Sequence, residues 1–532
     1  MCNLTLGVAA RTAVGKRWWR PGMLMWFLRR GFWDFVALVK FRAAKPDDIK
    51  LPPTERWYIE PKPMIKAIPQ IPLRNVKVCT RADIPRDERS LRNTIFFGVI
   101  VWLYTTWSPM QQGLPPIHKD PRVALKRAYR GLRRTLLDPP EMPAEYLGSP
   151  DLGSLAVRGP FACYTMQVKN STDWEWNLLS LKNYEHQEGL TNIGSRVLFR
   201  LDKRRRALEA YQIECDLGKI TPKDPLWDRA CKIALCAAST HLSLVRHFNW
   251  VHLAGGAHLA IATRNCLSAN HPLCRLLWPY IYGTQQSNDM VTRGQMVPGG
   301  DFETTFSLSF KGMCDLFDDS YLQYRHVVND PERDGRVRGV RGAGFDTPTQ
   351  DNLEALFDTM LQFTLNYLKI YYSPNATGAG SVRSDPQLMA WLEELKKRVP
   401  NGVGVTPTNV TRGTLARLLA NQLYLVTVQH EILGGFMWNY QLWTHRQPAR
   451  IYEDLRREPL DVYQRLVNAN YILNVRRRAL MYDFSYFGLD PLAKAAMFEF
   501  QKDLATLQAK MDSQPRAIWL VYPSALSVNI NA

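Results

Sequence analysis

The sequence lacks the features that define several large classes of protein. It contains no uninterrupted apolar run of about 20 residues, the length that a transmembrane helix needs. Its mean hydropathy is −0.27, and its 46% apolar and 22% charged residues are close to the average of soluble globular chains. A polytopic membrane protein, a collagen-like chain and a mainly disordered chain are thereby excluded.

Motifs for cysteine pairing and for secretion are also missing. The nine cysteines form no CxxC pair and no dense, regular spacing. We therefore expect reduced, mostly buried thiols in an intracellular protein. The first 22 residues contain no uninterrupted apolar segment of the kind found in a secretory signal. The expected location is cytoplasmic.

Acidic residues are outnumbered, with 49 Asp and Glu against 68 Lys and Arg, for a net charge of +19. Such an excess favours anionic membranes, nucleic acid or acidic ligands as partners. Arginine-rich runs, such as 204–206 and 476–478, are scattered along the chain. No continuous basic stripe, zinc-finger spacing or RNA-recognition signature is present. We expect no nucleic-acid partner.

At 532 residues, the chain could hold one very large core or two to three ordinary domains. Beyond residue 121, most segments place apolar residues at helical spacing, and few alternate as strands do. No internal repeat is visible. The pattern predicts one large, mainly α domain that begins near residue 110.

Two segments suggest contact with a membrane surface. Residues 16–42 interleave basic residues with Trp and Phe, which suits either a helix docked on the main body or an interfacial helix. Residues 94–107 are apolar but too short to span a bilayer. We expect a buried helix or a membrane-touching hairpin there, so peripheral membrane association stays open.

Histidines provide the candidate chemistry. Four lie on one long apolar helix pattern: His241, His247, His252 and His258. A single histidine there is usually a core residue, but four together indicate a metal site. His247 and His252 are five residues apart, and a regular α-helix would separate their side chains by about 140°. A π-bulge would bring both to one face, and such bulges occur mostly at functional sites.

A further histidine, His430, lies on another apolar helix pattern far downstream. Three neutral imidazoles without a cysteine favour Fe, Mn, Zn or Cu over Ca or Mg.

The stretch that begins at Trp227 resembles the iron-binding region of lipoxygenases. In that family, two histidines five apart on a long helix precede a run that here reads IATRNCLSANHPLCRLLWPY. Five further segments resemble the family, in order along the chain: IPRDERS, ALEAYQIECDL, NYLKIYYSP with SDPQLMAWLEEL, VTVQHEILGG and the tail YPSALSVNINA. The resemblance covers residues 81–532.

The resemblance implies a large, single, mainly α lipoxygenase catalytic domain over residues 81–532. Its long core helix would carry two metal-binding histidines. The amino-terminal PLAT/C2-like β-sandwich of many lipoxygenases is expected to be absent. Residues 1–80 would form a basic, aromatic-rich extension, whose segment 16–42 could serve as a membrane-surface helix in place of the sandwich.

The resemblance also implies the ligands of the metal centre. Carried over, His247, His252 and His430 are the imidazole ligands. An ungapped alignment of the tail places the C-terminal carboxylate of Ala532 as a further ligand, with Ile530 as the alternative if the tail is out of register. An α-carboxylate has a pKa of about 3.3–3.7, so it is an anionic oxygen donor at neutral pH. The implied cofactor is non-heme Fe, with Mn possible.

The sequence departs from the family pattern close to His430. Lipoxygenases usually have Asn, His or Ser four residues after the third histidine, but this chain has Gly434. We expect a water in that place or a lower coordination number, and we expect Asn at position 434 to restore the usual ligand set. Glu431 is expected to point away from the metal, either at the surface or behind the ligands.

A second departure concerns oxygen access. In the family, a small Ala or Gly correlates with the carbon and face that oxygen attacks. The matching position here is Val291 or Thr292, both larger, so we transfer no regiospecificity or stereospecificity. One extra residue after His252 places Gly255, Gly256 and His258 near the expected substrate channel. We expect His258 to be structural.

By this resemblance, the predicted function is that of an oxidoreductase of oxylipin and lipid metabolism. It would be a non-heme iron dioxygenase that inserts O2 into a polyunsaturated fatty acid or acyl chain to give a hydroperoxide. Two alternatives stay open. One keeps the fold and metal but alters the reaction, as a hydroperoxide isomerase or an oxygenase of a non-fatty-acid substrate. The other is a non-catalytic lipid-binding protein.

Overall fold

A computed structural model describes residues 49–88, 120–128, 140–375, 378–456, 466 and 478–530. The predicted surface helix 16–42, the apolar segment 94–107 and Ala532 lie outside these residues. No helix within the described ranges is long and apolar enough to cross a membrane. The eight described cysteines are all free thiols.

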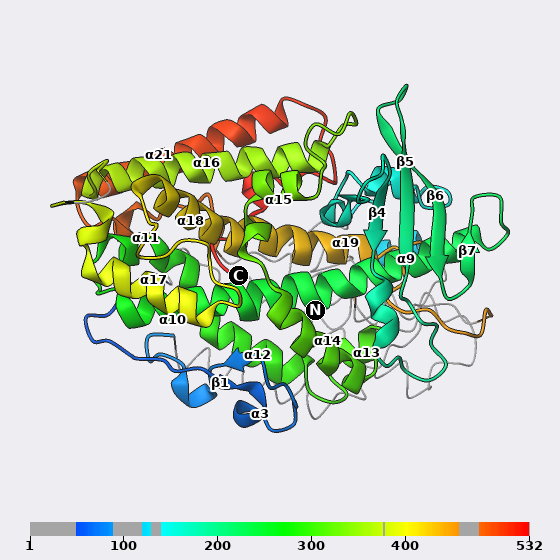
Figure 1. Cartoon of the computed structure of the whole chain (residues 1–532), viewed down its shortest axis with the longest axis horizontal. Coiled ribbons are helices and arrows are strands. Elements are labelled where there is room, and N and C mark those ends of the chain that lie inside the picture. The colour runs from blue at the N-terminus through cyan, green and yellow to red at the C-terminus, as the bar shows by residue number, and fades with distance from the viewer. Residues whose placement is uncertain are drawn as a thin grey trace, which may run out of the picture.

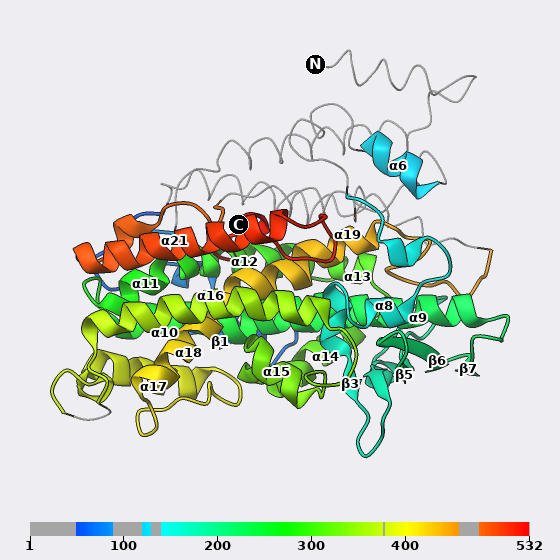
Figure 2. The same ribbon diagram turned by 90° about the horizontal axis from the view of Figure 1, so that it is seen from above.

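Helices dominate the described part of the chain, as the sequence predicts (Figure 1). Figure 2 shows α9 and α16 running along the same long direction. In chain order, the α-helices are α3 (Met64–Ala67), α6 (Pro121–Ala128), α8 (Leu152–Leu155), α9 (Trp227–His241), α10 (Ala257–Cys266), α11 (Pro272–Ile281), α12 (Thr284–Gln295), α13 (Asp301–Thr305), α14 (Phe310–Gln323), α15 (Pro331–Val337), α16 (Pro348–Tyr371), α17 (Pro386–Arg398), α18 (Arg412–Tyr424), α19 (Met437–Gln441) and α21 (Pro491–Asp512).

Three of these helices begin at an Asp–Pro pair. Asp330, Asp385 and Asp490 each accept hydrogen bonds from backbone N–H groups in the first turn of α15, α17 and α21. The proline that follows stands at the first helical position, where its missing N–H leaves no donor unpaired. The local sequence therefore fixes where these helices start.

Helix α16 lies between two other helices, α18 and α21. It packs against α18 on one face and against α21 on the other (Figures 1 and 2). The stacked rings of Phe363 and Phe500, whose centroids are 4.4 Å apart, join α16 to α21. Burial of such aromatic faces stabilises the contact between these two helices.

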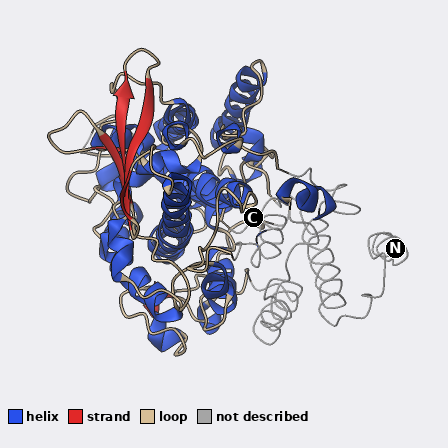
Figure 3. Cartoon of the chain, turned by 90° about the vertical axis from the view of Figure 1, so that its right-hand side faces the viewer, coloured by secondary structure: helices blue, strands red, loops and turns tan. Residues whose placement is uncertain are grey.

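A five-stranded antiparallel sheet stands at one side of the helical body (Figure 3). Its strands pair in chain order: β3 (Met166–Gln167), β4 (Trp174–Asn177), β5 (Arg196–Asp202), β6 (Ala207–Cys215) and β7 (Gly218–Ile220). Trp174, Trp176, Val197 and Phe199 are buried, and they alternate with more exposed residues. This sheet was not predicted from the sequence, because β3, β4 and β7 have only two to four residues and the longer β6 does not alternate regularly between buried and exposed residues.

Residues 49–80 pack on the helices. The short strands β1 (Lys62–Pro63) and β2 (Lys77–Val78) pair with each other. The Asn265 side chain of α10 accepts a hydrogen bond from Ile59 N at 2.9 Å and donates one to Ile59 O at 2.8 Å. The domain boundary near residue 80 stays a prediction.

Two long helices contain π-helical segments and meet in the core. The first π-segment, Leu242–Gly256, joins α9 to α10 without a break. On the second helix, the π-segments Leu425–Gln429 and Ile432–Phe436 lie between α18 and α19. The residues of these π-segments are mostly buried, so most of their side chains face the interior.

Candidate metal centre

The π-segments place the predicted histidines. His247 and His252 both lie on the first π-segment, whose hydrogen bonds join residues five apart, so the two side chains are on the same face. The predicted π-bulge is confirmed, although it extends over 15 residues. His430 stands between the two π-segments of the second helix.

The structure brings these three histidines together. Each pair of ring centroids is 5.0 Å apart. One nitrogen from each ring lies within 4.8 Å of the others. Within the described ranges, no other group of three His, Cys, Asp or Glu side chains has this spacing. Three nitrogen atoms at this spacing could hold one metal ion.

Burial keeps the imidazoles of His247 and His252 neutral. It lowers the pKa of His247 well below the usual range, and the neighbouring His252 and His430 lower that pKa further. Burial also lowers the pKa of His252 to about 4, against the opposing effect of its hydrogen bond to Asn288. At pH 7, His247 and His252 are therefore uncharged, and each offers a lone pair to a metal.

Asn288 of α12 orients His252. Its side-chain Nδ2 donates to His252 O at 2.9 Å, which turns Oδ1 toward the ring. His252 Nδ1 then donates to Asn288 Oδ1 at 3.1 Å, leaving Nε2 as the ligand atom. Asn288 could not be predicted from the sequence, since no local spacing links two positions 36 residues apart.

The Nε2 atom of His247 fits a ligand role. It is buried and has no hydrogen-bond partner among the described residues. A buried polar atom without a partner costs free energy, which a bound metal would offset.

Gly434 contacts the same ring. A Cβ atom at this position would lie 2.8 Å from His247 Nε2 and 3.0 Å from His247 Cε1. Any side chain at position 434 would therefore have to displace the His247 ring. The sequence alone did not indicate this displacement, which Gly434→Asn would also require. Glycine is the residue that this close approach permits.

Two further glycines allow close approach to the site. A Cβ on Gly255 would lie 2.6 Å from Leu425 Cδ2, on the second histidine-bearing helix. A Cβ on Gly256 would lie 3.2 Å from Ile530 Cδ1. Larger residues at either position would separate the elements that form the centre.

The C-terminal tail enters the core beside the first π-segment. Asn529 Nδ2 donates to Pro279 O at 2.8 Å, and Ser287 Oγ donates to Ile530 O at 3.5 Å. The Ile530 side chain is buried against Gly256. Ala532, two residues further, lies outside the described residues, so its carboxylate as a ligand stays a prediction.

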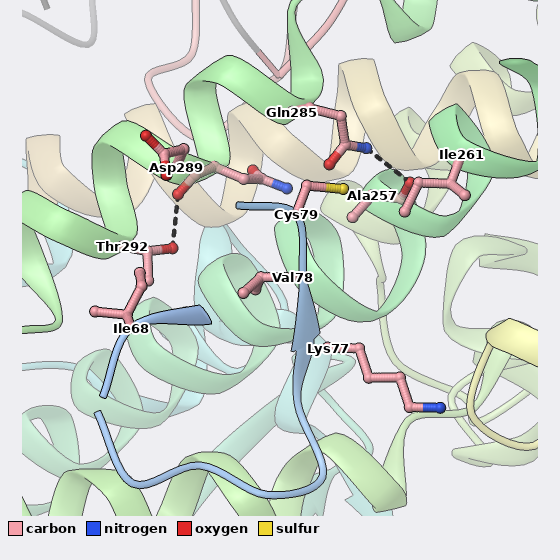
Figure 4. Close-up of a pocket in the computed structure, with 10 residues that line it drawn as sticks. Ile68, Lys77, Val78, Cys79, Ala257, Ile261, Gln285, Asp289 and Thr292 are labelled. Carbon is pink, nitrogen blue, oxygen red and sulfur yellow. Dashed lines mark hydrogen bonds between the residues drawn. The ribbon is translucent and has the colours of Figure 1, made fainter. Parts of the chain in front are cut away.

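The two candidates for oxygen access have different surroundings. Thr292 is buried and lines a narrow pocket together with Asn288, and its Oγ1 donates to Asn288 O at 2.6 Å. In Figure 4, β2 crosses beside this pocket, opposite Thr292 and Gln285 of α12. Val291 is partly buried against the core and does not line the pocket. The role of either residue in oxygen access stays a prediction.

Two other polar residues lie apart from the triad. His258 is buried, and its Nε2 lies 2.6 Å from Tyr321 Oη, as a structural residue would. Glu431 is buried, so it is not at the surface. Its Oε1 lies 2.6 Å from where a Cβ on Gly435 would be, so the carboxylate folds along its own helix.

Comparisons with known sequences agree with this geometry. The chain is 25% identical over 329 residues to the polyunsaturated fatty acid lipoxygenase ALOX15 of Mus musculus, covering 57% of this chain and 48% of that enzyme. It is 27% identical over 183 residues to the chloroplastic lipoxygenase 2 of Tanacetum cinerariifolium, covering 32% of this chain and 20% of that one. The chain thus spans about half the length of the mouse enzyme and a smaller share of the plant enzyme. No family model matches the chain.

Solved structures show the same fold. A coral 8R-lipoxygenase matches with a TM-score of 0.68 at 15% identity, over 86% of this chain and 77% of that one. The manganese lipoxygenase of Gaeumannomyces graminis matches with a TM-score of 0.67 at 13% identity, over 86% and 94%. The chain therefore has the fold of lipoxygenase catalytic domains, and the sequence matches support a lipoxygenase-family catalytic domain.

Proposed function

We propose that the protein is a metal-dependent dioxygenase that inserts O2 into a polyunsaturated fatty acid or acyl chain to give a hydroperoxide. The observation that carries this proposal is the convergence of His247, His252 and His430 within 4.8 Å on two π-helical segments. Neutral imidazoles at this spacing suit iron or manganese, and one relative of the same fold is a manganese lipoxygenase.

The chain's own residues would prepare the site. The three histidines would hold the metal, with the Ala532 carboxylate as a fourth ligand in this proposal. Asn288 fixes the His252 ring, and the buried surroundings exclude water from the reacting centre. A bound iron or manganese would supply the one-electron chemistry that lets a hydrogen atom leave the lipid.

The substrate class in this proposal is inferred from the named substrates of similar proteins. The matched mouse enzyme is named as a polyunsaturated fatty acid lipoxygenase. A variant lipoxygenase of the same fold, matched with a TM-score of 0.64 at 17% identity, was solved in complex with arachidonate. We extend that lipid class to this chain.

A second candidate function is favoured by Gly434. The position that usually carries a ligand side chain in lipoxygenases contacts His247 without one. Such a centre would have a different ligand set, which would favour isomerisation of a lipid hydroperoxide or oxygenation of another substrate. Thr292 beside Asn288 is a second difference that would alter access to the site.

One experiment tests both candidates. Protein with a native C-terminus is analysed for metal, and O2 uptake and conjugated-diene absorbance are followed with linoleate. About one iron or manganese per chain with both signals supports the dioxygenase. Metal without diene formation, combined with turnover of linoleate hydroperoxide, favours the second candidate.

Two histidine variants provide the control. His252→Gln should lose metal and activity together. His258→Gln removes another buried histidine outside the triad and should retain both. Full metal content in His252→Gln would contradict the proposed centre.

A further inference from the structure

Arg246 is a charged residue in an apolar helix, directly before His247. Its guanidinium carbon lies 5.1 Å from the centroid of the Tyr164 ring and 5.5 Å from that of the Trp250 ring. The two aromatic rings hold the side chain by cation–π contact. Arginine stays protonated in proteins, so this is a fixed positive charge.

Among the described residues, Arg246 has no carboxylate within ion-pairing distance, and it interacts with the Asp334 charge only at longer range. Across the described residues, Arg246 forms neither a hydrogen bond nor an ion pair, and its Nε atom is buried. The carboxylate of Asp334, on the same cavity wall, is taken by Arg338, with Nε to Oδ2 at 2.7 Å. Arg338 also donates to Ala162 O at 3.1 Å. An unpaired interior charge is costly, whereas a charge with a bound counter-ion is much less so.

Arg246 lines a cavity whose polar wall also includes Asp334, Arg338, Gln350 and Gln429. Its charged groups are two guanidinium groups and one carboxylate, which leaves one excess positive charge. The cavity measures about 40 Å³. Since a single water needs roughly 10–15 Å³ by this measure, the cavity has room for a small polar group but not for an acyl chain.

We propose that this cavity is an anion site, in which Arg246 binds a carboxylate group beside the metal-binding helix. The planar guanidinium suits a carboxylate through paired N–H donors. The carboxylate has two possible sources, the acid end of a lipid and a free small carboxylate. The lipid source rests on the proposed function, whereas binding of a free anion does not.

The test uses acetate as the probe and the full chain. Saturation-transfer NMR of the acetate methyl group detects weak binding without turnover, so a negative result leaves the proposed dioxygenase untouched. Wild-type protein should give a saturable signal. Arg246→Gln should weaken binding at least tenfold, whereas Arg205→Gln, which removes an exposed positive charge that does not line the cavity, should not change it.

Further variants keep the result interpretable. If Arg246→Gln fails to fold, Leu353→Phe narrows the same cavity while retaining every charge, and it should also lose the acetate signal. Absence of a saturable signal in the wild type, or an unchanged signal in Arg246→Gln, would overturn the anion site. Displacement of acetate by linoleate but not by linoleyl alcohol assigns the lipid's carboxylate as the natural occupant. Retention of acetate with both lipids assigns a free anion.

Discussion

The backbone of Gly434 lies directly against the His247 imidazole, so closely that a Cβ would be 2.8 Å from Nε2. In lipoxygenases, the position of Gly434 usually carries a ligand side chain. Here that position lies directly against His247, which is itself a proposed ligand. Changes at residue 434 should therefore act through the position of the His247 ring.

We expect Gly434→Ala to lower metal content and activity at least tenfold, because the added Cβ displaces His247. Metal analysis and O2 uptake check this result. Gly413→Ala on α18 is the matched control, since a Cβ there meets only Thr411 Oγ1 at 3.9 Å. Higher metal content or lipoxygenase activity in Gly434→Asn would instead show that the ring yields and the usual ligand set is restored.

Asn288→Ala should weaken metal binding by about 10–100-fold, because His252 would lose the partner that fixes its ring. Competition with a metal chelator measures the change. Asn265→Ala removes comparable hydrogen bonds on α10, to Ile59, and should leave metal affinity unchanged. Equal affinities in wild type and Asn288→Ala would remove Asn288 from the centre.

His258 should make the metal-free protein less stable in mild acid. Burial lowers its folded-state pKa to about 3, while the unfolded chain binds a proton near the ordinary pKa of about 6.5. The unfolded state therefore binds more protons between these values, so stability falls as pH drops below 6.5. Between pH 7 and 5, His258 should contribute a loss of about 2 kcal/mol.

Urea unfolding of the metal-free wild type and of His258→Gln at the two pH values checks this contribution. The variant should lose about 2 kcal/mol less than the wild type between pH 7 and 5. Identical losses would mean that His258 takes up its proton over the same pH range in the folded and unfolded chains, so that burial does not lower its pKa.

Extra residues after Ala532 should lower metal content, because they would replace the proposed carboxylate ligand with a peptide bond. Metal analysis of protein with a short C-terminal tag checks this result. The same tag at the N-terminus is the control. Unchanged metal content with the C-terminal tag would contradict the ligand role of Ala532.

Removal of residues 1–42 should reduce sedimentation with anionic liposomes, since this segment carries the basic and aromatic residues of the proposed membrane contact. Neutral liposomes are the control for charge dependence. Equal sedimentation of both forms would place the contact elsewhere or exclude it.

The histidine triad could be predicted from the sequence because the five-residue spacing and the family segments are local patterns. The structure added what local patterns do not contain. Asn288 reaches His252 only through the packing of α12 against the first π-segment. The contact of Gly434 with His247 depends on the distance between two helices. The sheet β3–β7 was not predicted because strands as short as Met166–Gln167 give little periodicity, and the nine residues of β6 do not alternate regularly between buried and exposed.

The 15-residue π-segment links metal affinity to helix register. Rewinding of this segment into the common α-helical form would rotate His252 away from His247, since residues five apart diverge in that form. A metal held by both rings opposes this rotation, so part of its binding free energy is stored in the helix. Loss of the metal should then speed hydrogen exchange of the backbone amides along the whole segment, and not only at the ligand residues.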